Sequence, residues 1–413
     1  MTERSDLDAY AARCRAWLAG RWPPKAAAGR WGEGSDDVSV FHALSHDEEL
    51  SLIRRGMSWQ AEKHAAGYGA ITWPRSYGGS GLSDEHARVF RFEEAAFDVP
   101  AGHELLRITV NLVAPTIHAV GSDGQRDRFV RRFLGCEELS CQLFSEPGAG
   151  SDLAGLATRA RPDGDRWLVN GAKVWASGAQ FAAWGVLLGR TDPDVPKHAG
   201  MTAFLLPMDA AGVEIRPIRQ MTGGSSFNEV FLTDVSLPDS LRLGEVGAGW
   251  KVALTMLGFE RAQSGAKKGV GGSWEQLRAL ATRLGVTGDP VVRQRLMRVY
   301  THERLREITR QRTEANRRRG GAPGPEGSLG KLLWTQGLTA IADAAALLLG
   351  PRLIANTGEW GSYAWAQHVL GAPGYRIAGG SDEIQRTIIA ERTLGLPPEP
   401  GDDRRRPWRD IPR

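Results

Sequence analysis

The sequence predicts an α+β protein of several domains, in which a helical domain, a β domain and a second helical domain follow one another. Its 413 residues exceed what one compact core usually holds. Apolar residues recur at helical spacing up to about Glu138 and again after Gly249, and short β-type runs separated by turn residues lie between. We therefore expect a helical domain over 1–138, a β domain over 139–245, a helical domain over 246–396 and a disordered, Pro-, Asp- and Arg-rich tail over 397–413.

In the first domain, one helix is expected after Ser45, a possible N-cap. Leu50, Ile53 and Met57 follow it at helical spacing. A second helix is expected after Ser83, and the proline and glycines between Trp73 and Ser83 predict a loop.

In the β domain, two β-type runs, 166–169 and 173–175, flank Asn170-Gly171, which predicts a hairpin turn. Two more β-type runs cover 202–206 and 229–232, and Pro238 ends the pattern.

The last domain is expected to open with a helix after Gly249 that has Trp250, Leu254, Leu257 and Arg261 on one face. Further helices are expected over the following ranges: 291–318, 329–349 and 381–394.

Composition excludes several classes of protein. The longest apolar stretch, Ala340–Leu349, is too short to span a membrane, and the first residues do not read as a secretory signal. Three cysteines are too few for a disulfide framework or a zinc site, so we expect a cytoplasmic protein without a metal. The net charge of +4 and the absence of aromatic residues within the richest basic cluster, Arg317–Arg319, argue against nucleic-acid binding.

Common nucleotide and hydrolase motifs are also missing from the sequence. It has no Walker loop, no His-Glu-x-x-His and no Gly-x-Ser-x-Gly elbow. The run Gly269–Gly272 lacks the spacing of a dinucleotide-binding loop. A dinucleotide would therefore be bound without a doubly wound domain.

Three segments carry the chemical signal. The first, Phe144–Asp152, has small residues after a proline, which let a backbone approach a ligand closely, although alone it fits a solvent loop as well. In the second, Trp175–Gly178, an indole and a hydroxyl can stack on and hydrogen-bond a flat heteroaromatic ring. The third, Gly379–Arg386, is a glycine turn that opens a helix, which suits an anion or the edge of a cofactor.

These segments, in this order and with this domain organisation, resemble the acyl-CoA dehydrogenase family, from Trp73-Pro74 to Arg392. The resemblance implies a β-barrel-like middle domain between an N-terminal helical domain and a C-terminal helical bundle. It also implies that FAD is the cofactor and that an acyl-CoA thioester is dehydrogenated to the trans-2-enoyl-CoA.

The resemblance also assigns roles to single residues. Phe144 and Ser145 would face the flavin, and Ser151 would line the acyl-CoA path. Trp175 would cover the flavin face away from the substrate, with Ser177 hydrogen-bonding near N5. The alternative for Trp175 is an ordinary half-buried strand residue. From the C-terminal domain, the residues that would approach the cofactor are Gly380, Ser381 and Glu383.

The family needs a carboxylate base that removes the α-proton of the thioester. Many members carry it where this sequence has Gly379, which cannot take a proton. Members that resemble isovaleryl-CoA dehydrogenase carry a glutamate followed by arginine on a helix, which corresponds here to Glu260 and the possible substrate contact Arg261.

Helical spacing independently places Ala253, Leu257 and Glu260 on one face, at the end of an apolar stripe. An apolar setting raises the pKa of a carboxyl group toward the range that is useful for a general base. The alternative is that Glu260 is a surface glutamate or an ion-pair partner.

In place of two segments with which the family contacts FAD, this sequence has Trp274–Arg278 and Leu347–Pro351. Arg293 or Arg295 could then supply the contacts to the FAD pyrophosphate and adenine. These features resemble an actinobacterial branch in which some members form hetero-tetramers that act on sterol side-chain CoA esters. We expect a homo-tetramer or a hetero-tetramer with a related subunit, and an electron-transferring flavoprotein as acceptor. The alternatives are a non-catalytic partner subunit and a flavin oxidase or monooxygenase of the same fold.

Overall fold

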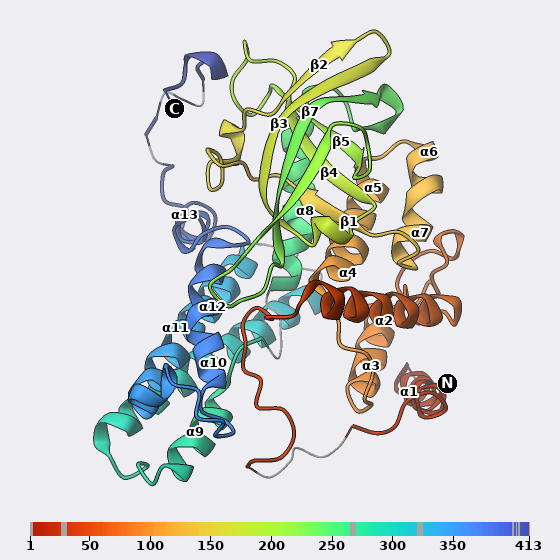
Figure 1. Cartoon of the computed structure of the whole chain (residues 1–413). Helices are drawn as coiled ribbons and strands as arrows, with labels where there is room; N and C mark the ends of the chain where they lie inside the picture. Colours follow the sequence, from red (N-terminus) through yellow and green to blue (C-terminus); the bar gives the residue numbers. More distant parts are fainter. Residues whose placement is uncertain are drawn as a thin grey trace.

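The computed structural model describes residues 3–25, 31–264, 270–319, 325–398, 400–401, 403 and 405–412. Figure 1 shows a β domain that lies against two groups of helices, one built from the N-terminal part of the chain and one from the C-terminal part. The predicted α+β class and the order helical, β, helical are confirmed.

In the N-terminal part of the chain, π-helical turns at 109–113 and 126–130 each join two short α-helices. Ser45 is the predicted N-cap, and it forms a capping box with Glu48. The loop predicted over 73–83 contains a single 3-10 turn at Arg75–Tyr77. The helices are α1 Glu3–Ala19, α2 His46–Ala65, α3 Asp84–Glu94, α4 Glu104–Ile108, α5 Ala114–Val120, α6 Asp123–Gln125 and α7 Arg131–Leu134.

The β domain is one mixed sheet in the order β6-β7-β3-β2-β4-β5-β8, with β1 paired in parallel to β4. Its central strands β4 and β5 are almost wholly buried, because helices pack on one of their faces and side chains of β3 and β7 pack on the other. The strands are β1 Ser140–Leu143, β2 Arg159–Asp163, β3 Arg166–Ser177, β4 Trp184–Arg190, β5 Met201–Pro207, β6 Val213–Ile218, β7 Phe227–Pro238 and β8 Arg242–Leu243.

The hairpin predicted at Asn170-Gly171 is wrong, because β3 runs straight through it. The Asn170 amide instead pairs with Asp234 across a bulge, donating to its carboxylate at 3.0 Å and accepting its backbone N–H at 2.9 Å. Gly171 is needed for close approach, since a Cβ there would lie 2.4 Å from the Thr158 hydroxyl. The true turn between β2 and β3 is at Gly164, which has a φ of 63°.

The C-terminal helices pack around α11, which contacts α8, α9, α10, α12 and α13. By length and composition, the stretch Glu326–Leu353 could cross a membrane, and it is the one such stretch in the described residues. Half of its most apolar window is buried inside the protein, as expected of a central core helix. The helices are α8 Gly249–Ser264, α9 Trp274–Arg283, α10 Pro290–Arg318, α11 Glu326–Leu349, α12 Ala364–Ile377 and α13 Asp382–Arg392.

The helix α8 lies between the sheet and the C-terminal helices (Figure 1). Its buried face is formed by Val252, Ala253 and Met256, with Leu257 partly buried beside them. The predicted face through Leu254 is therefore wrong, because Leu254 is exposed. The alternative face through Ala253 and Leu257, which leads to Glu260, is the one that packs.

The tail beyond Pro397, expected to be disordered, instead returns to the β domain in its described residues. Pro407 forms a bridge with Pro196, and the backbone N–H of Trp408 donates to the Val195 carbonyl at 3.0 Å. The Trp408 ring lies 4.8 Å from the Arg190 guanidinium. The polar composition of the tail predicted disorder, but the contacts of one tryptophan and a few backbone hydrogen bonds are enough to hold its described residues on the β domain.

Glu49 on α2 contacts two histidines. His42 lies in the segment that precedes α2, and His103 is the N-cap of α4. The Glu49 carboxylate lies 2.9 Å from Nε2 of the buried His103 and 3.3 Å from Nε2 of His42. Within the described residues these three side chains are close enough to share a metal ion. However, Nδ1 of His103 accepts the Leu105 N–H, so Nε2 carries a proton and donates to Glu49. The cluster is therefore a hydrogen-bonded clamp.

We expect this clamp to stabilise the fold at neutral pH and to fail in acid. Burial opposes ionisation of Glu49, but the hydrogen bonds from both histidines lower its pKa from 4.5 to about 2. The stabilisation is then complete above about pH 4.5 and is lost as the pH falls toward 2, by up to about 3 kcal/mol. Urea unfolding of Glu49→Gln should lack this part of the pH dependence. Identical acid profiles of variant and wild type would contradict the prediction.

Candidate active site

A buried ion pair anchors the loop 144–152. Lys173 on β3 is fully buried, and its Nζ lies 2.7 Å from Oε1 of Glu146 and donates to the Phe144 carbonyl at 3.2 Å. Burial lowers the pKa of Lys173 to about 8, although the charge of Glu146 opposes this. The Glu146 carboxylate also accepts the N–H groups of Ala157 and Thr158, at 2.6 and 2.9 Å. The loop is thus held from inside the sheet.

The predicted ligand residues of this loop differ in exposure. Phe144 is buried in the core, so its ring contributes packing. Ser145 is half-buried, and its carbonyl accepts the Val174 N–H at 2.9 Å, which ties the loop to the end of β3. Ser151 is exposed.

Trp175 is 59% exposed, although it lies near the end of a sheet strand. Its φ of 61° is a left-handed conformation that is costly for a bulky residue and is common at ligand sites. The indole stands edge-on to Phe227 at 6.1 Å, and Ser177 pairs with the same Phe227 in the sheet. An exposed aromatic face beside a hydroxyl fits the expected flavin.

A series of rings links this strand end to the C-terminal helices. Phe227 contacts Phe41 at 5.5 Å, and Phe41 stacks on Tyr375 of α12 at 4.8 Å. The β-domain part of the site and the helix that precedes Gly379 therefore lie together around the segment before α2.

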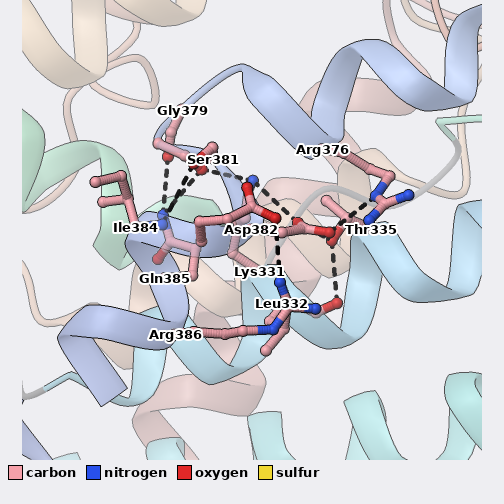
Figure 2. A network of polar contacts seen from close by, with 12 residues as sticks. Lys331, Leu332, Thr335, Arg376, Gly379, Ser381, Asp382, Ile384, Gln385 and Arg386 are labelled. Atoms are coloured by element: carbon pink, nitrogen blue, oxygen red, sulfur yellow. Dashed lines mark hydrogen bonds and ion pairs between the residues drawn. The ribbon is translucent and has the colours of Figure 1, made fainter. Parts of the chain in front are cut away.

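The turn between α12 and α13 has two successive left-handed glycines, Gly379 with a φ of 67° and Gly380 with a φ of 83°. Ser381 is the N-cap of α13, and its hydroxyl accepts the Ile384 N–H at 3.3 Å (Figure 2). Glu383 is exposed and pairs with Arg386 of its own helix. A ligand would thus meet mainly the backbone of this turn.

Glu260 is half-buried near the end of α8, and its carboxylate lies against this turn. An ideal Cβ built on Gly379 would lie 3.0 Å from Oε1 of Glu260. The two positions at which the family resemblance allows a base thus meet at one place in space. The side chain of Arg261, the predicted substrate contact, lies outside the described residues.

Charged groups face Glu260 on its polar side. Burial lowers the pKa of Lys331, while the charges of Asp382 and Glu260 oppose this. Burial would likewise lower the pKa of Arg107, but Glu104, with a further contribution from Glu260, raises it overall. Burial raises the pKa of Tyr375, and the charge of Glu260 adds to this. The apolar setting expected from the helical spacing therefore holds only on the side of Ala253 and Leu257.

Sequence reasoning missed the buried charges around the site. Lys331 is the lone charge between residues 327 and 342, which could have marked it. Asp382 and Gln385 lie within a motif that was recognised, yet their burial was not expected. Lys173 interrupts a β-type run, and Glu146 stands in the first ligand segment. A charge inside an apolar pattern was the signal in both Lys331 and Lys173.

The chain matches three family models: the acyl-CoA dehydrogenase N-terminal domain over residues 42–137, the middle domain over 141–235 and the C-terminal domain over 247–394. "Acyl-CoA dehydrogenase IpdE1" of Mycobacterium tuberculosis is 38% identical over 403 residues, which cover 95% of this chain and 99% of that protein. "Acyl-CoA dehydrogenase FadE34" of the same organism is 40% identical over 79% of this chain and 44% of its own length.

The titles of two similar solved structures each name two proteins. The "Tcur3481-Tcur3483 steroid ACAD" is 26% identical with a TM-score of 0.74, and the match covers 96% of this chain and 99% of that one. The "ChsE4-ChsE5 complex from Mycobacterium tuberculosis" is 26% identical with a TM-score of 0.68, covering 97% and 99%.

Proposed function

Because this chain belongs to the acyl-CoA dehydrogenase family, we propose that it forms a trans-2-enoyl-CoA from an acyl-CoA thioester, with Glu260 as the base that takes the α-proton. The family binds FAD, and FAD is the cofactor of this enzyme. Bound FAD supplies the acceptor for the β-hydrogen, which leaves as hydride.

One observation carries the role of Glu260: its carboxylate lies beside Gly379, where other family members have their base. Glycine leaves the space open, and α8 supplies the missing carboxylate from the neighbouring helix. The apolar neighbours Ala253 and Leu257 fix that helix against the core, so the carboxylate has a defined place.

The other predicted residues bind and orient FAD and the acyl-CoA. Trp175 offers an open aromatic face, and Ser177 a hydroxyl, on the β-domain side of the flavin. Ser145 stands at the same strand end, and Ser151 on the exposed loop lies along the proposed path of the acyl-CoA. The turn of Gly380 and Ser381 contributes backbone, and Glu383 stands at the start of α13.

We propose a steroid-derived acyl group as substrate and a hetero-tetramer with a related subunit as the assembly, with the homo-tetramer as the alternative. The titles of the two similar structures support this, because each names two proteins, one names a complex and the other a steroid ACAD. An electron-transferring flavoprotein is the proposed acceptor. The described cysteines are all free and buried, which is consistent with a cytoplasmic location.

The function is tested by the visible spectrum of the protein expressed alone, before and after anaerobic addition of acyl-CoAs from short to branched and sterol-derived. We expect a yellow protein that a sterol-derived thioester bleaches. Bleaching only by a short or branched thioester would overturn the proposed substrate class. A colourless protein, or one that no thioester bleaches, would contradict independent activity and indicate a partner subunit. Fast reoxidation of the bleached protein by oxygen would indicate an oxidase.

A further inference from the structure

The turn that touches Glu260 is held by its carbonyl groups. The Gly380 carbonyl accepts from Nζ of Lys331 at 2.7 Å and from Nε2 of Gln385 at 3.1 Å. The Gly379 carbonyl accepts from the same Gln385 amide at 3.2 Å. Lys331 is 3% exposed and Gln385 2%, so both donors act from inside the protein.

Fixing these carbonyls also fixes the N–H groups behind them. In a trans peptide the C=O and the following N–H point in opposite directions. The N–H groups of Gly380 and Ser381 therefore point away from Lys331 and Gln385. Among the described residues neither N–H donates to another protein group. Two preset backbone donors thus remain for a ligand beside Glu260.

Lys331 is in turn held by a network on three helices (Figure 2). Its Nζ lies 3.7 Å from the carboxylate of Asp382, which is 1% exposed. Asp382 also accepts from the Thr335 hydroxyl at 2.7 Å and from Nε of Arg376 at 3.0 Å. Because Lys331 and Thr335 are one turn apart on α11, the carboxylate docks the start of α13 on that helix.

We propose that Lys331 is a positioning residue for the reaction, which holds the Gly379–Ser381 turn so that its free N–H groups can stabilise the thioester oxygen while Glu260 takes the α-proton. This inference rests on the proposed function. Donors aimed at a developing oxyanion each contribute about 10²–10³ in rate, so a turn that relaxes should lower kcat far more than it raises KM.

The test compares FAD-loaded Lys331→Met with wild type, using the acyl-CoA that bleaches the wild-type flavin. We expect kcat to fall by about 100-fold with KM within about threefold. The acid limb of the kcat profile should move to higher pH, because a cation near Glu260 is removed. Hydrogen exchange of the peptide covering 378–385 should become faster without ligand. Lys251→Met, at an exposed lysine on α8, is the matched control and should change nothing.

Wild-type kcat, pH profile and exchange in Lys331→Met would overturn the proposal. If that variant does not fold, Asp382→Asn is the second test, because it keeps the shape of the side chain and removes the charge that faces Lys331 and Arg376. It should show a smaller loss in kcat and faster exchange, and wild-type values in both would overturn the proposal. If no thioester bleaches the wild type, the proposed function is wrong. The comparison of hydrogen exchange between Lys331→Met and wild type would still test whether Lys331 holds the turn.

Discussion

Replacing Glu260 by Gln should lower the rate of flavin reduction by acyl-CoA by about 10³-fold or more, with FAD content and substrate binding retained. Glutamine keeps the size of the side chain but cannot take the α-proton, and general-base catalysis is worth about 10²–10⁴ in rate. Since Glu260 is only half-buried, the variant should fold normally. The measurement is anaerobic rapid mixing with the acyl-CoA that bleaches the wild type.

Glu245→Gln is the matched control for this experiment. Glu245 has no assigned role in the site, and its side chain is 93% exposed and lies 3.8 Å from Arg242. Flavin reduction should stay at the wild-type rate, since this glutamate faces solvent. An equal loss in both variants would mean that the removal of a negative charge, not the loss of a base at Glu260, governs the rate.

Breaking the buried pair of Glu146 and Lys173 should have the largest effect on stability. Lys173→Met leaves the Glu146 carboxylate buried without its cation, which costs about 3–5 kcal/mol in comparable pairs. Because this carboxylate also fixes the loop 144–152, FAD content should fall together with stability. Urea unfolding and the flavin absorbance of the purified protein measure the two effects.

The double variant Glu146→Gln with Lys173→Met is the control for that prediction. It removes both charges, and the Gln carbonyl oxygen can still accept one of the two backbone N–H groups. It should therefore be more stable than Lys173→Met alone, by a margin outside the error of the unfolding curves. A double variant as unstable as the single one would show that volume and packing, not the unpaired charge, cause the loss.

Local signals in the sequence predicted local structure well. The capping box at Ser45 and the helix around Leu50 and Ile53 depend on residues within one or two turns, so their pattern is sufficient. The hairpin predicted at Asn170 is absent because the Asn170 amide hydrogen-bonds Asp234 on β7, a strand that is far away in sequence. A strong turn dipeptide was thus overridden by a tertiary contact.

The candidate site was only partly predictable for the same reason. Glu260 could be selected by its helical face and by the glycine at position 379, but nothing local shows that the two meet. The supporting pairs join residues far apart in sequence: Lys331 with Asp382, and Glu146 with Lys173. Such partners meet only when the domain that contains both of them has folded.

Moving the carboxylate from position 260 to position 379 most directly tests the central claim, which is that Glu260 is the base of the reaction. Glu260→Gly should be nearly inert, and adding Gly379→Glu should restore flavin reduction by at least about tenfold, because both positions reach the same space. The rescue should be incomplete, since a φ of 67° costs a non-glycine residue about 1–2 kcal/mol. The measurement is the rate constant of flavin reduction in the wild type, Glu260→Gly and the double variant. Inactive Glu260→Gly with a restored double variant is the predicted result, and Glu260→Gly that reduces its flavin at the wild-type rate would contradict the account.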